Sequence, residues 1–335
     1  MERKHIRALI LTEGGDKIGY GHITRCLSLY QALEEEGIKP YMLIRGDESV
    51  TDLLSNIDFE IYDWLNLYHY DILRHADIVI IDSYQAPPYI YEEISKTVKI
   101  PMYIDDIGRL DYPKGILLNG NIYANELYNK KRSDILYLLG PKYIPLRKEF
   151  WNISNKRKIK ERISSLMITF GGSDLRNLTP FILKILVNNF PSYKKKVIIG
   201  KGFEGKNIKK IKNIMDENTE IIYNPNANTL INTMLSSDIA ISAGGQTLYE
   251  LARTGTPSIV ISVAENQLRN ARASHKAGFV KYIGWWEYLK YRDIFKAVKF
   301  LESYYVRKYM YNKGISCVDG LGSLRVAKLL KKLLI

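Results

Sequence analysis

A glycine-rich turn that contains one histidine is the segment of this sequence best suited to chemistry. Residues 12–22 read TEGGDKIGYGH, between a predicted strand at 7–11 and a helical pattern that begins near His22. A helix N-terminus presents unpaired N–H groups and the positive end of the helix dipole, which favour an anionic ligand. Gly19 and Gly21 lack the side chains that would keep such a ligand away. We therefore predict an anion-binding loop, with His22 as the titratable group beside it.

A second glycine turn, Gly171-Gly172-Ser173, follows a predicted strand in the middle of the chain. Its backbone amides are suited to cradling a phosphate, with the Ser173 hydroxyl as a further donor. A Gly-Gly pair after a strand is also common as a plain tight turn, and that alternative stays open. The pattern is neither a P-loop nor GxGxxG, so it does not indicate ATP or a dinucleotide.

A third turn, Gly244-Gly245-Gln246, joins a predicted strand to a helix that carries Glu250 about one turn in. An ionised carboxylate only accepts hydrogen bonds, so it matches a ribose diol, which offers two donors side by side. A first-turn glutamate that merely complements the helix dipole is the alternative. Both interpretations of Glu250 remain open at this point.

Polar residues follow three other predicted strands. Tyr84, in Asp82-Ser83-Tyr84, is placed to hold a sugar or a water through its hydroxyl. Asp105-Asp106 would suit metal or acid–base chemistry, but we favour a capping role because no third ligand lies nearby in sequence. Asn266-Gln267 place two amides where a substrate could be recognised, and capping of the following helix is their alternative.

Composition narrows the class of protein. The 335 residues are 46% hydrophobic and 25% charged, which is typical of a globular chain long enough for two domains. The net charge of +13 favours anionic partners, but no nucleic-acid-binding signature accompanies it, so we expect a solvated basic surface. The two cysteines, Cys26 and Cys317, and the five histidines show no metal-ligand spacing, so we expect no metal site and no disulfide framework.

Targeting signals are also missing from the sequence pattern. The apolar run Ala8–Leu11 is far too short for a signal peptide, and no stretch approaches the roughly 20 apolar residues of a membrane span. We therefore expect a soluble, cytoplasmic protein. The segment Val326–Leu334 is amphipathic, with three lysines on its polar side. It could lie on a membrane surface, but we favour a helix packed back across the two domains.

Short β-branched runs alternate with helical periodicity through most of the chain, which predicts an α/β protein with parallel sheets flanked by helices. We predict five strands in each half, at residues 7–12, 40–44, 78–82, 102–105 and 116–119, and at 166–170, 196–200, 220–223, 239–242 and 258–263. The predicted organisation is two Rossmann-type domains that face each other across a cleft. Their expected bounds are 1–150 and 165–302, with a polar linker at 151–164 and C-terminal helices at 303–335 that pack back on the first domain.

Taken together, these segments resemble the UDP-2,4-diacetamido-2,4,6-trideoxy-β-L-altropyranose hydrolases of pseudaminic acid biosynthesis (the PseG family) and their spore-coat polysaccharide relatives. The matching pieces occur in the family's order and cover most of the chain: residues 18–27, 82–84, 105–106, 117–121, 143–147, 171–174, 177–179, the segment around Glu250, 265–267 and 319–322. The resemblance implies a GT-B-like fold, close to that of the MurG glycosyltransferase.

The resemblance also implies an activity, which is hydrolysis of a UDP-linked sugar at its anomeric carbon to release UDP and free sugar. It implies that His22 is the base that activates water, with Tyr84 beside it, and that Glu250 holds the ribose. It implies that the glycine turns bind the diphosphate and that Asn266, next to Gln267, lies in the substrate pocket, with no metal or cofactor. Because the helix dipole disfavours a charged imidazole, we expect a neutral His22 that can take a proton near pH 7. Attack opposite the nucleotide would invert the anomeric centre.

Two other functions remain as alternatives. A GT-B glycosyltransferase would use the same cleft, with an acceptor hydroxyl in place of water. A non-enzymatic module that binds nucleotide sugars or nucleic acid ranks last, because it leaves His22 unexplained. We expect a monomer that binds a UDP-sugar and does not bind nucleic acid.

Overall fold

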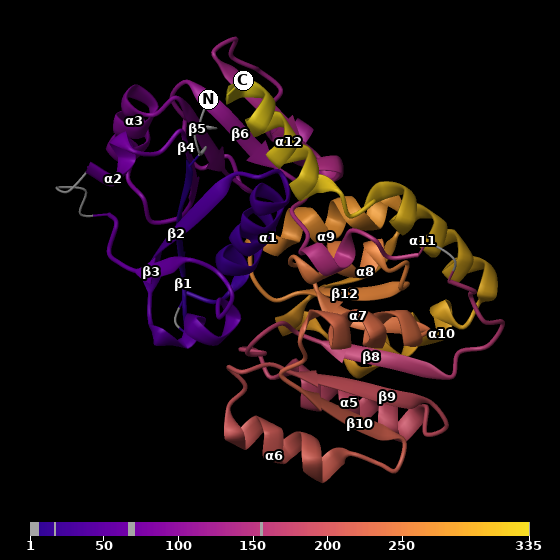
Figure 1. Cartoon of the computed structure of the whole chain (residues 1–335). Coiled ribbons are helices and arrows are strands. Elements are labelled where there is room, and N and C mark those ends of the chain that lie inside the picture. Colours follow the sequence, from indigo (N-terminus) through magenta and orange to yellow (C-terminus); the bar gives the residue numbers. More distant parts are fainter. Residues whose placement is uncertain (1–6, 17, 66–70, 155–156, 335) are drawn as a thin grey trace. The chain divides into compact units, whose positions relative to one another are not determined.

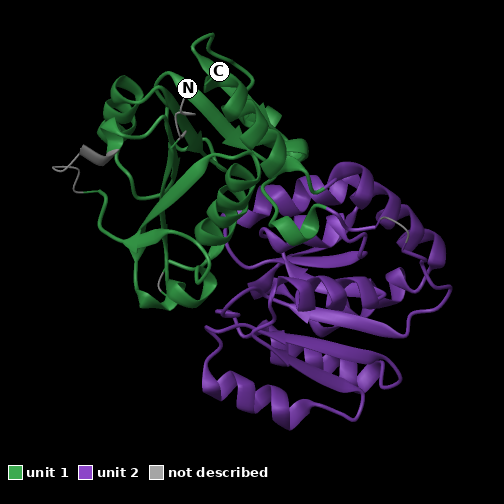
Figure 2. Ribbon diagram, viewed as in Figure 1, with its two compact units in different colours: residues 1–151, 320–335 green, residues 152–319 purple. Residues whose placement is uncertain are grey.

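A computed structural model describes residues 7–16, 18–65, 71–154 and 157–334 (Figure 1). The chain divides into two compact units, Met1–Trp151 with Gly320–Ile335 and Asn152–Asp319 (Figure 2). Each unit is an α/β domain with its own parallel sheet and its own core. The expectation that the two domains face each other across a cleft stays a prediction.

Unit 1 is built on a sheet whose described strands run in the order β3-β2-β1-β4-β5-β6-β7, all parallel. This is the Rossmann strand order, in which the winding reverses between β1 and β4. The strands are β1 (Arg7–Gly14), β2 (Lys39–Gly46), β3 (Phe59–Ile61), β4 (Ile78–Asp82), β5 (Ile100–Ile104), β6 (Gly115–Asn119) and β7 (Ile135–Leu139). The helices are α1 (Gly21–Glu35), α2 (Asp71–Arg74), α3 (Pro88–Thr97), α4 (Ala124–Leu127) and α12 (Gly322–Leu334), with 3₁₀ turns at Glu48–Leu53, Pro141–Tyr143 and Lys148–Phe150.

The apolar run of β4 shows why this sheet is covered on both faces. All five of its residues are buried. Ile78 and Ile80 pack in the core cluster that includes α1 and α12, whereas Val79 and Ile81 pack in the cluster that includes α3. Successive side chains of a strand point to opposite faces, so a continuous aliphatic run needs helices on both sides.

Helix α1 buries one apolar face. Ile23, Cys26, Tyr30 and Leu33 are buried in the core of unit 1. The helix ends at Glu35, and Gly37 adopts a φ of +75°, a left-handed conformation that glycine reaches without steric penalty. The helix therefore stops just before this glycine.

Unit 2 repeats the same topology. Its described strands run in the order β10-β9-β8-β11-β12-β13, again all parallel. They are β8 (Ser165–Thr169), β9 (Lys194–Ile199), β10 (Thr219–Tyr223), β11 (Ile239–Ala243), β12 (Ser258–Ser262) and β13 (Val280–Trp285). The helices are α5 (Leu178–Asn189), α6 (Gly205–Ile214), α7 (Ala227–Ser236), α8 (Thr247–Arg253), α9 (Asn266–Ala277), α10 (Tyr291–Leu301) and α11 (Tyr304–Cys317), with a 3₁₀ turn at Trp286–Tyr288.

The chain divides differently from the expected domain bounds near its linker and its C-terminus. The segment expected as a linker is tied to unit 2, since the buried Arg307 donates to the carbonyls of Lys160 (2.8 Å) and Glu161 (2.9 Å). Of the C-terminal helices, α11 packs against α8 in unit 2, and α12 packs against α1 in unit 1.

Helix α12 has its apolar face covered. Val326, Ala327 and Leu330 are buried in the core of unit 1, and the Ser323 hydroxyl donates to the Leu146 carbonyl at 3.0 Å. This packing leaves those three apolar side chains unavailable to a lipid surface, which argues against the membrane-surface interpretation. Within the described residues, no helix is long and apolar enough to cross a bilayer.

Candidate functional site

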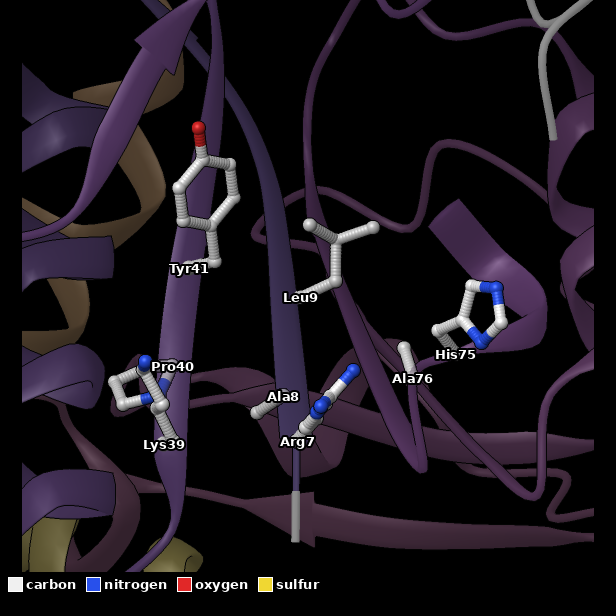
Figure 3. A pocket seen from close by; sticks show the side chains of 8 residues that line it. All are labelled: Arg7, Ala8, Leu9, Lys39, Pro40, Tyr41, His75 and Ala76. Atoms are coloured by element: carbon white, nitrogen blue, oxygen red, sulfur yellow. The ribbon is translucent and has the colours of Figure 1, made fainter. Parts of the chain in front are cut away.

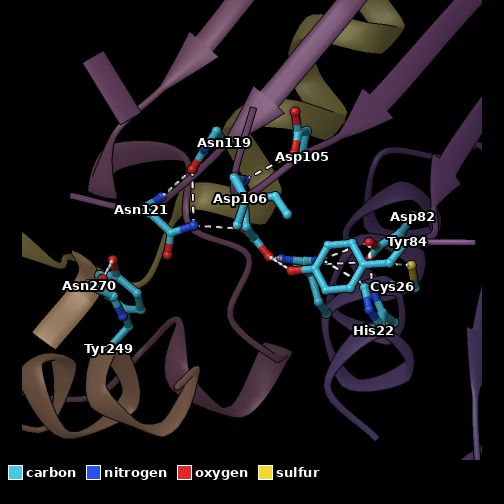
Figure 4. Close-up of polar contacts among 12 residues, drawn as sticks. His22, Cys26, Asp82, Tyr84, Asp105, Asp106, Asn119, Asn121, Tyr249 and Asn270 are labelled. Carbon is cyan, nitrogen blue, oxygen red and sulfur yellow. Dashed lines mark hydrogen bonds and ion pairs between the residues drawn. The ribbon is translucent and has the colours of Figure 1, made fainter. Parts of the chain in front are cut away.

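His22 and Asp82 meet where the winding of the unit 1 sheet reverses. The loop after β1 leads into α1, which carries His22 as its second residue, and β4, the neighbour of β1, ends at Asp82. The Nδ1 atom of His22 lies 2.7 Å from Oδ1 of Asp82 (Figure 4). Both side chains are buried, His22 at 9% and Asp82 at 0% exposed. In open α/β sheets, ligands bind beyond the carboxyl ends of the strands, at the point where the strand order reverses.

Arg25 determines which nitrogen of His22 carries the proton. Its guanidinium donates two parallel hydrogen bonds to Asp82, from Nε to Oδ2 at 2.8 Å and from a terminal nitrogen to Oδ1 at 2.7 Å. Although burial raises it, these partners hold the pKa of Asp82 well below its usual range, so the carboxylate is ionised and can only accept. Nδ1 of His22 must therefore be the donor, and in the neutral imidazole Nε2 keeps its lone pair. Within the described part of the chain, Nε2 has no polar partner.

The pKa of His22 is shifted in the direction opposite to the one that the helix dipole predicts. Burial lowers the pKa of the imidazole, but the charge and hydrogen bond of Asp82 outweigh it, so the pKa lies above its ordinary value of 6.5. The expectation of a lowered pKa is therefore wrong. The cause is distance, since a full charge at 2.7 Å acts more strongly than the partial charge of a helix end.

Asp106 joins Tyr84 to the same cluster. Its Oδ2 accepts from Arg25 at 2.6 Å and from the Tyr84 hydroxyl at 3.0 Å, and its Oδ1 accepts from Nδ2 of Asn121 at 2.7 Å (Figure 4). The rings of Tyr84 and His22 touch edge to face, with centroids 4.6 Å apart. Burial, together with the Asp106 charge, raises the pKa of the Tyr84 hydroxyl well above 10. Tyr84 thus stays protonated beside His22.

The two adjacent aspartates after β5 have different roles. Asp105 accepts the backbone N–H groups of Ile107, Gly108 and Arg109 at 3.0, 3.1 and 2.9 Å, so its predicted capping role is confirmed. For Asp106 the capping prediction is wrong, because its carboxylate is bound by Arg25, Tyr84 and Asn121. A cap and a site residue therefore sit side by side in sequence.

Glu13 braces the loop that carries Tyr84. Its buried carboxylate accepts the Tyr84 backbone N–H at 2.8 Å and the Ser83 hydroxyl at 2.5 Å. This ties the end of β1 to the end of β4 and so fixes the two segments that carry His22 and Tyr84. Asp82, Arg25, Asp106 and Glu13 were all absent from the predicted site. One signal pointed to Arg25, since it lies three residues after His22 and thus on the same face of the helix.

The glycines of the first loop are only in part available to a ligand. Gly19 adopts a φ of +90°, which favours glycine, and its N–H donates to the Gly15 carbonyl at 2.7 Å. That amide is therefore used within the loop. Gly21 is the exposed first residue of α1, and the N-cap residue Tyr20 makes no side-chain capping bond. An anion at this loop would meet the first turn of α1.

In unit 2 the first glycine turn follows β8, at the point where that sheet reverses its winding. Gly171 is exposed with a φ of +75°, Gly172 is exposed and Ser173 is half-buried. The neighbouring Asp174 caps α5, because its carboxylate accepts the N–H groups of Leu178 at 3.0 Å and Thr179 at 2.8 Å. The start of α5 is thus satisfied by its own chain, and the donors left for a phosphate are those of the turn.

The third glycine turn follows β11, the neighbour of β8. Gln267 reaches back to it, and its Oε1 accepts the N–H groups of Gly244 at 3.2 Å and Val263 at 3.1 Å. Gln267 therefore links the ends of β11 and β12, which neither a substrate-binding amide nor a helix cap predicts. Asn270, which the sequence interpretation missed, donates to the Gly244 carbonyl at 3.0 Å.

The remaining predicted residues of unit 2 differ in exposure. Gly245 is half-buried, Gln246 is the N-cap residue of α8, and Glu250 is buried within that helix. Asn266 is exposed at the start of α9. The glycine turn at 244–246 and the Glu250 carboxylate thus lie at the same junction, between β11 and α8.

The described residues contain no candidate metal site, and a pocket lies at the other end of the unit 1 strands from His22. Over the described residues, no group of three or more His, Cys, Asp or Glu side chains is arranged to hold a metal ion, and His5 and His69 lie outside those residues. A pocket of about 470 Å³ opens at the amino ends of β1 and β2, lined by Arg7–Leu9, Lys39–Tyr41, His75 and Ala76 (Figure 3). His22 and Asp82 follow the opposite ends of the strands, so this pocket is separate from them.

Comparison with known proteins supports the interpretation of the sequence. Residues 166–309 match the family model of the glycosyltransferase family 28 C-terminal domain. The chain is 27% identical over 266 residues to a Helicobacter pylori protein named pseudaminic acid cytidylyltransferase and UDP-2,4-diacetamido-2,4,6-trideoxy-beta-L-altropyranose hydrolase; the match covers 78% of this chain and 46% of that protein. It is 23% identical to the spore coat polysaccharide biosynthesis protein SpsG of Bacillus subtilis, over 97% of each chain.

Two of the curated relatives are much longer than the region that matches this chain. An uncharacterised protein of Methanocaldococcus jannaschii is 26% identical over 278 residues, and the match covers 78% of this chain and 57% of that protein. The chain therefore spans about half the length of two of the three curated relatives.

Solved structures show the fold. The MurG crystal structure from Acinetobacter baumannii superposes with a TM-score of 0.68 at 14% identity, covering 98% of this chain and 99% of MurG. A UDP complex of Staphylococcus aureus MnaA gives a TM-score of 0.66 at 13% identity, covering 98% and 97%. The predicted GT-B-like fold and the predicted resemblance are both confirmed. The chain thus has a GT-B-like fold and is similar in sequence to the PseG-type protein and to SpsG, and its residues 166–309 match the model of the glycosyltransferase family 28 C-terminal domain.

Proposed function

We propose that this protein is an inverting UDP-sugar hydrolase that cleaves the anomeric C–O bond and releases UDP and the free sugar. The observation that carries the proposal is the buried His22–Asp82 pair, 2.7 Å apart at the ligand-binding edge of the unit 1 sheet. The Helicobacter pylori relative, whose name includes a UDP-sugar hydrolase, supports the choice of substrate.

In this proposal His22 is the general base. Asp82 and Arg25 hold the imidazole with Nδ1 protonated, which leaves Nε2 to take a proton from water. A positioned base of this kind contributes about 10²–10⁴-fold to the rate. Tyr84, in ring contact with His22, helps to hold the water.

Unit 2 holds the nucleotide. Glu250 accepts hydrogen bonds from the ribose diol, and the turns at 171–173 and 244–246 bind the diphosphate. Because Asp174 and Gln267 already satisfy nearby amides, we assign the diphosphate chiefly to the N–H groups of Gly172, Ser173 and Gly245. Fixed donors there stabilise the charge that develops on the departing UDP. Asn266 completes the sugar pocket, and the step uses no metal or cofactor.

The substrate to test is UDP-2,4-diacetamido-2,4,6-trideoxy-β-L-altropyranose. Proton NMR should show UDP and free sugar forming without any added acceptor. His22→Gln should abolish release while leaving UDP affinity nearly unchanged, since UDP is assigned to unit 2. His75→Ala is the matched control, because His75 is exposed at the opposite edge of the sheet, and it should retain the wild-type rate. Wild-type turnover in His22→Gln would refute the assigned base.

A UDP-sugar glycosyltransferase is the second candidate. The glycosyltransferase family 28 match over 166–309 and the MurG-like fold favour it. The two candidates differ in one requirement, since a transferase needs an acceptor alcohol. UDP release that appears only when a glycan or lipid acceptor is added would favour the transferase and count against hydrolysis.

A further inference from the structure

The pocket at the amino end of the unit 1 sheet has no part in the proposed function. Its volume of about 470 Å³ lies in the range of pockets that bind small molecules. Its lining comes from the starts of β1 and β2 and from the segment that follows α2 (Figure 3). The floor is closed by the protein itself, since Ala8 and Leu9 are only 2% and 3% exposed.

The register of β1 and β2 places two cations side by side at the rim of this pocket. The strands are parallel, with Arg7 beside Lys39 and Leu9 beside Tyr41. Neighbouring strands lie about 4.8 Å apart and residues two apart on a strand share a face, so these four side chains form one panel. The exposed charges come first, and the apolar side chains follow one step further in (Figure 3).

His75 adds a third basic side chain to the lining. The Asp77 N–H donates to the Arg7 carbonyl at 3.0 Å, which fixes this segment beside the start of β1. The Asp77 carboxylate accepts the Arg7 backbone N–H at 3.1 Å and is not part of the lining. Among the described residues that line the pocket, none is acidic.

The three basic side chains are not neutralised by the part of the chain that the structure describes. Within those residues, the side chains of Arg7, Lys39 and His75 make no hydrogen bond or ion pair. Like charges on adjacent strands repel each other, and an anion between them removes that repulsion. The rim of the pocket therefore favours a negatively charged group.

We propose that this pocket binds a small amphipathic anion, whose carboxylate or phosphate group lies between Arg7 and Lys39. A guanidinium can donate two parallel hydrogen bonds to either group. The apolar ring of the ligand packs against Leu9 and Tyr41. The opposite orientation is disfavoured, because the Tyr41 hydroxyl donates to the Glu60 carboxylate at 3.4 Å and a second anion there would be repelled.

Surface charge alone would need no ligand. With a net charge of +13, the chain carries many cations that water solvates. The difference here is the apolar floor directly beside the cations, which water cannot hydrogen-bond. A ligand that carries both a charge and an apolar ring gains from both surfaces at once.

The pocket is separate from the proposed reaction. Asp82 ends β4 and His22 follows the carboxyl end of β1, whereas the pocket opens at the amino ends of β1 and β2. Binding is therefore measured without UDP-sugar, and the result does not depend on whether the protein is a hydrolase.

The experiment compares two anions with a neutral analogue. The anions are 2-naphthoate and 2-naphthyl phosphate, the analogue is 2-naphthamide, and inorganic phosphate supplies a charge without a ring. The protein carries carbon-13 in its histidine rings, and the His75 NMR signal is assigned with His75→Gln. At least one naphthyl anion should shift this signal saturably, and 2-naphthamide and inorganic phosphate should each bind at least about 10-fold more weakly than that anion.

A double variant tests the two cations. Arg7→Met with Lys39→Met should weaken the tighter anion by at least about 10-fold and leave 2-naphthamide nearly unchanged. Lys114→Met with Lys130→Met is the matched control. Both lysines are exposed in unit 1 and outside the pocket lining, and their loss lowers the net charge equally, so the control should bind the anion like the wild type.

Three results would overturn the proposal. The first is the absence of a saturable His75 shift with either naphthyl anion. The second is equal affinity for 2-naphthamide and the anions, which would show that the cations play no part. The third is an equal loss of anion affinity in the two double variants, which would assign binding to net charge and not to this pocket.

Discussion

The Asp82 carboxylate binds both the proposed base, His22, and the cationic side chain of Arg25. Asp82→Asn is therefore the most informative single change. The side chain is fully buried and accepts bonds of 2.7 and 2.8 Å from Arg25 and 2.7 Å from His22. An asparagine of the same shape offers one acceptor and one donor, so one Arg25 donor meets an N–H group. Removing one partner of a buried ion pair costs about 3–5 kcal/mol of unfolding free energy.

The assay pairs urea unfolding with UDP release. We expect Asp82→Asn to lower the free energy of unfolding by about 3 kcal/mol or more, and to lower turnover by about 10²–10⁴-fold through loss of the oriented base. Asp63→Asn is the control, since Asp63 pairs with Arg45 at 3.0 Å with 52% of its side chain exposed, and a change below about 1 kcal/mol is expected there. Equal losses in the two variants would refute the importance given to the buried pair.

Three further predictions test other parts of the molecule. The pKa of His22 is raised in the folded protein, so its contribution to stability is present below 6.5 and is lost as pH rises through the raised value. The wild type should therefore exceed His22→Gln in unfolding free energy by more at about pH 5.5 than at about pH 9, and equal differences would contradict this. Glu250→Gln should weaken UDP binding by about 10-fold in calorimetry and remove the preference for UDP over 2′-deoxy-UDP. Gly200→Ala should weaken UDP binding, because its Cβ would lie 2.4 Å from the Gly172 carbonyl oxygen, whereas Gly205→Ala, which meets nothing within 4 Å, should not.

The sequence predicted the central strands of both sheets and missed three of the edge strands. Ten strands were expected, and each corresponds to an observed strand with ends that differ by a few residues at most. The strands that were missed, β3, β7 and β13, all lie at a sheet edge. Central strands are buried on both faces and read as continuous aliphatic runs, whereas an edge strand such as β13 is half-buried and mixed in composition.

The site was predicted only in part, for a different physical reason. His22 and Tyr84 stood out because of their positions at strand ends, but the bonds that set their protonation join residues 22 and 25 to 82 and 106. Those contacts follow from strand order, which places β4 directly beside β1 and β5 beside β4. The dipole argument failed for the same reason, since it considered the helix and could not include a carboxylate from another strand.

The fate of oxygen in water labelled with oxygen-18 tests the central claim most directly. If His22 activates water for attack on the anomeric carbon, the label enters the free sugar, the released UDP stays unlabelled, and the sugar first appears as the inverted anomer. Label in the UDP would mean attack at phosphorus, and retained anomeric configuration would mean a covalent or substrate-assisted route. Either result would contradict the mechanism proposed for His22 and Asp82.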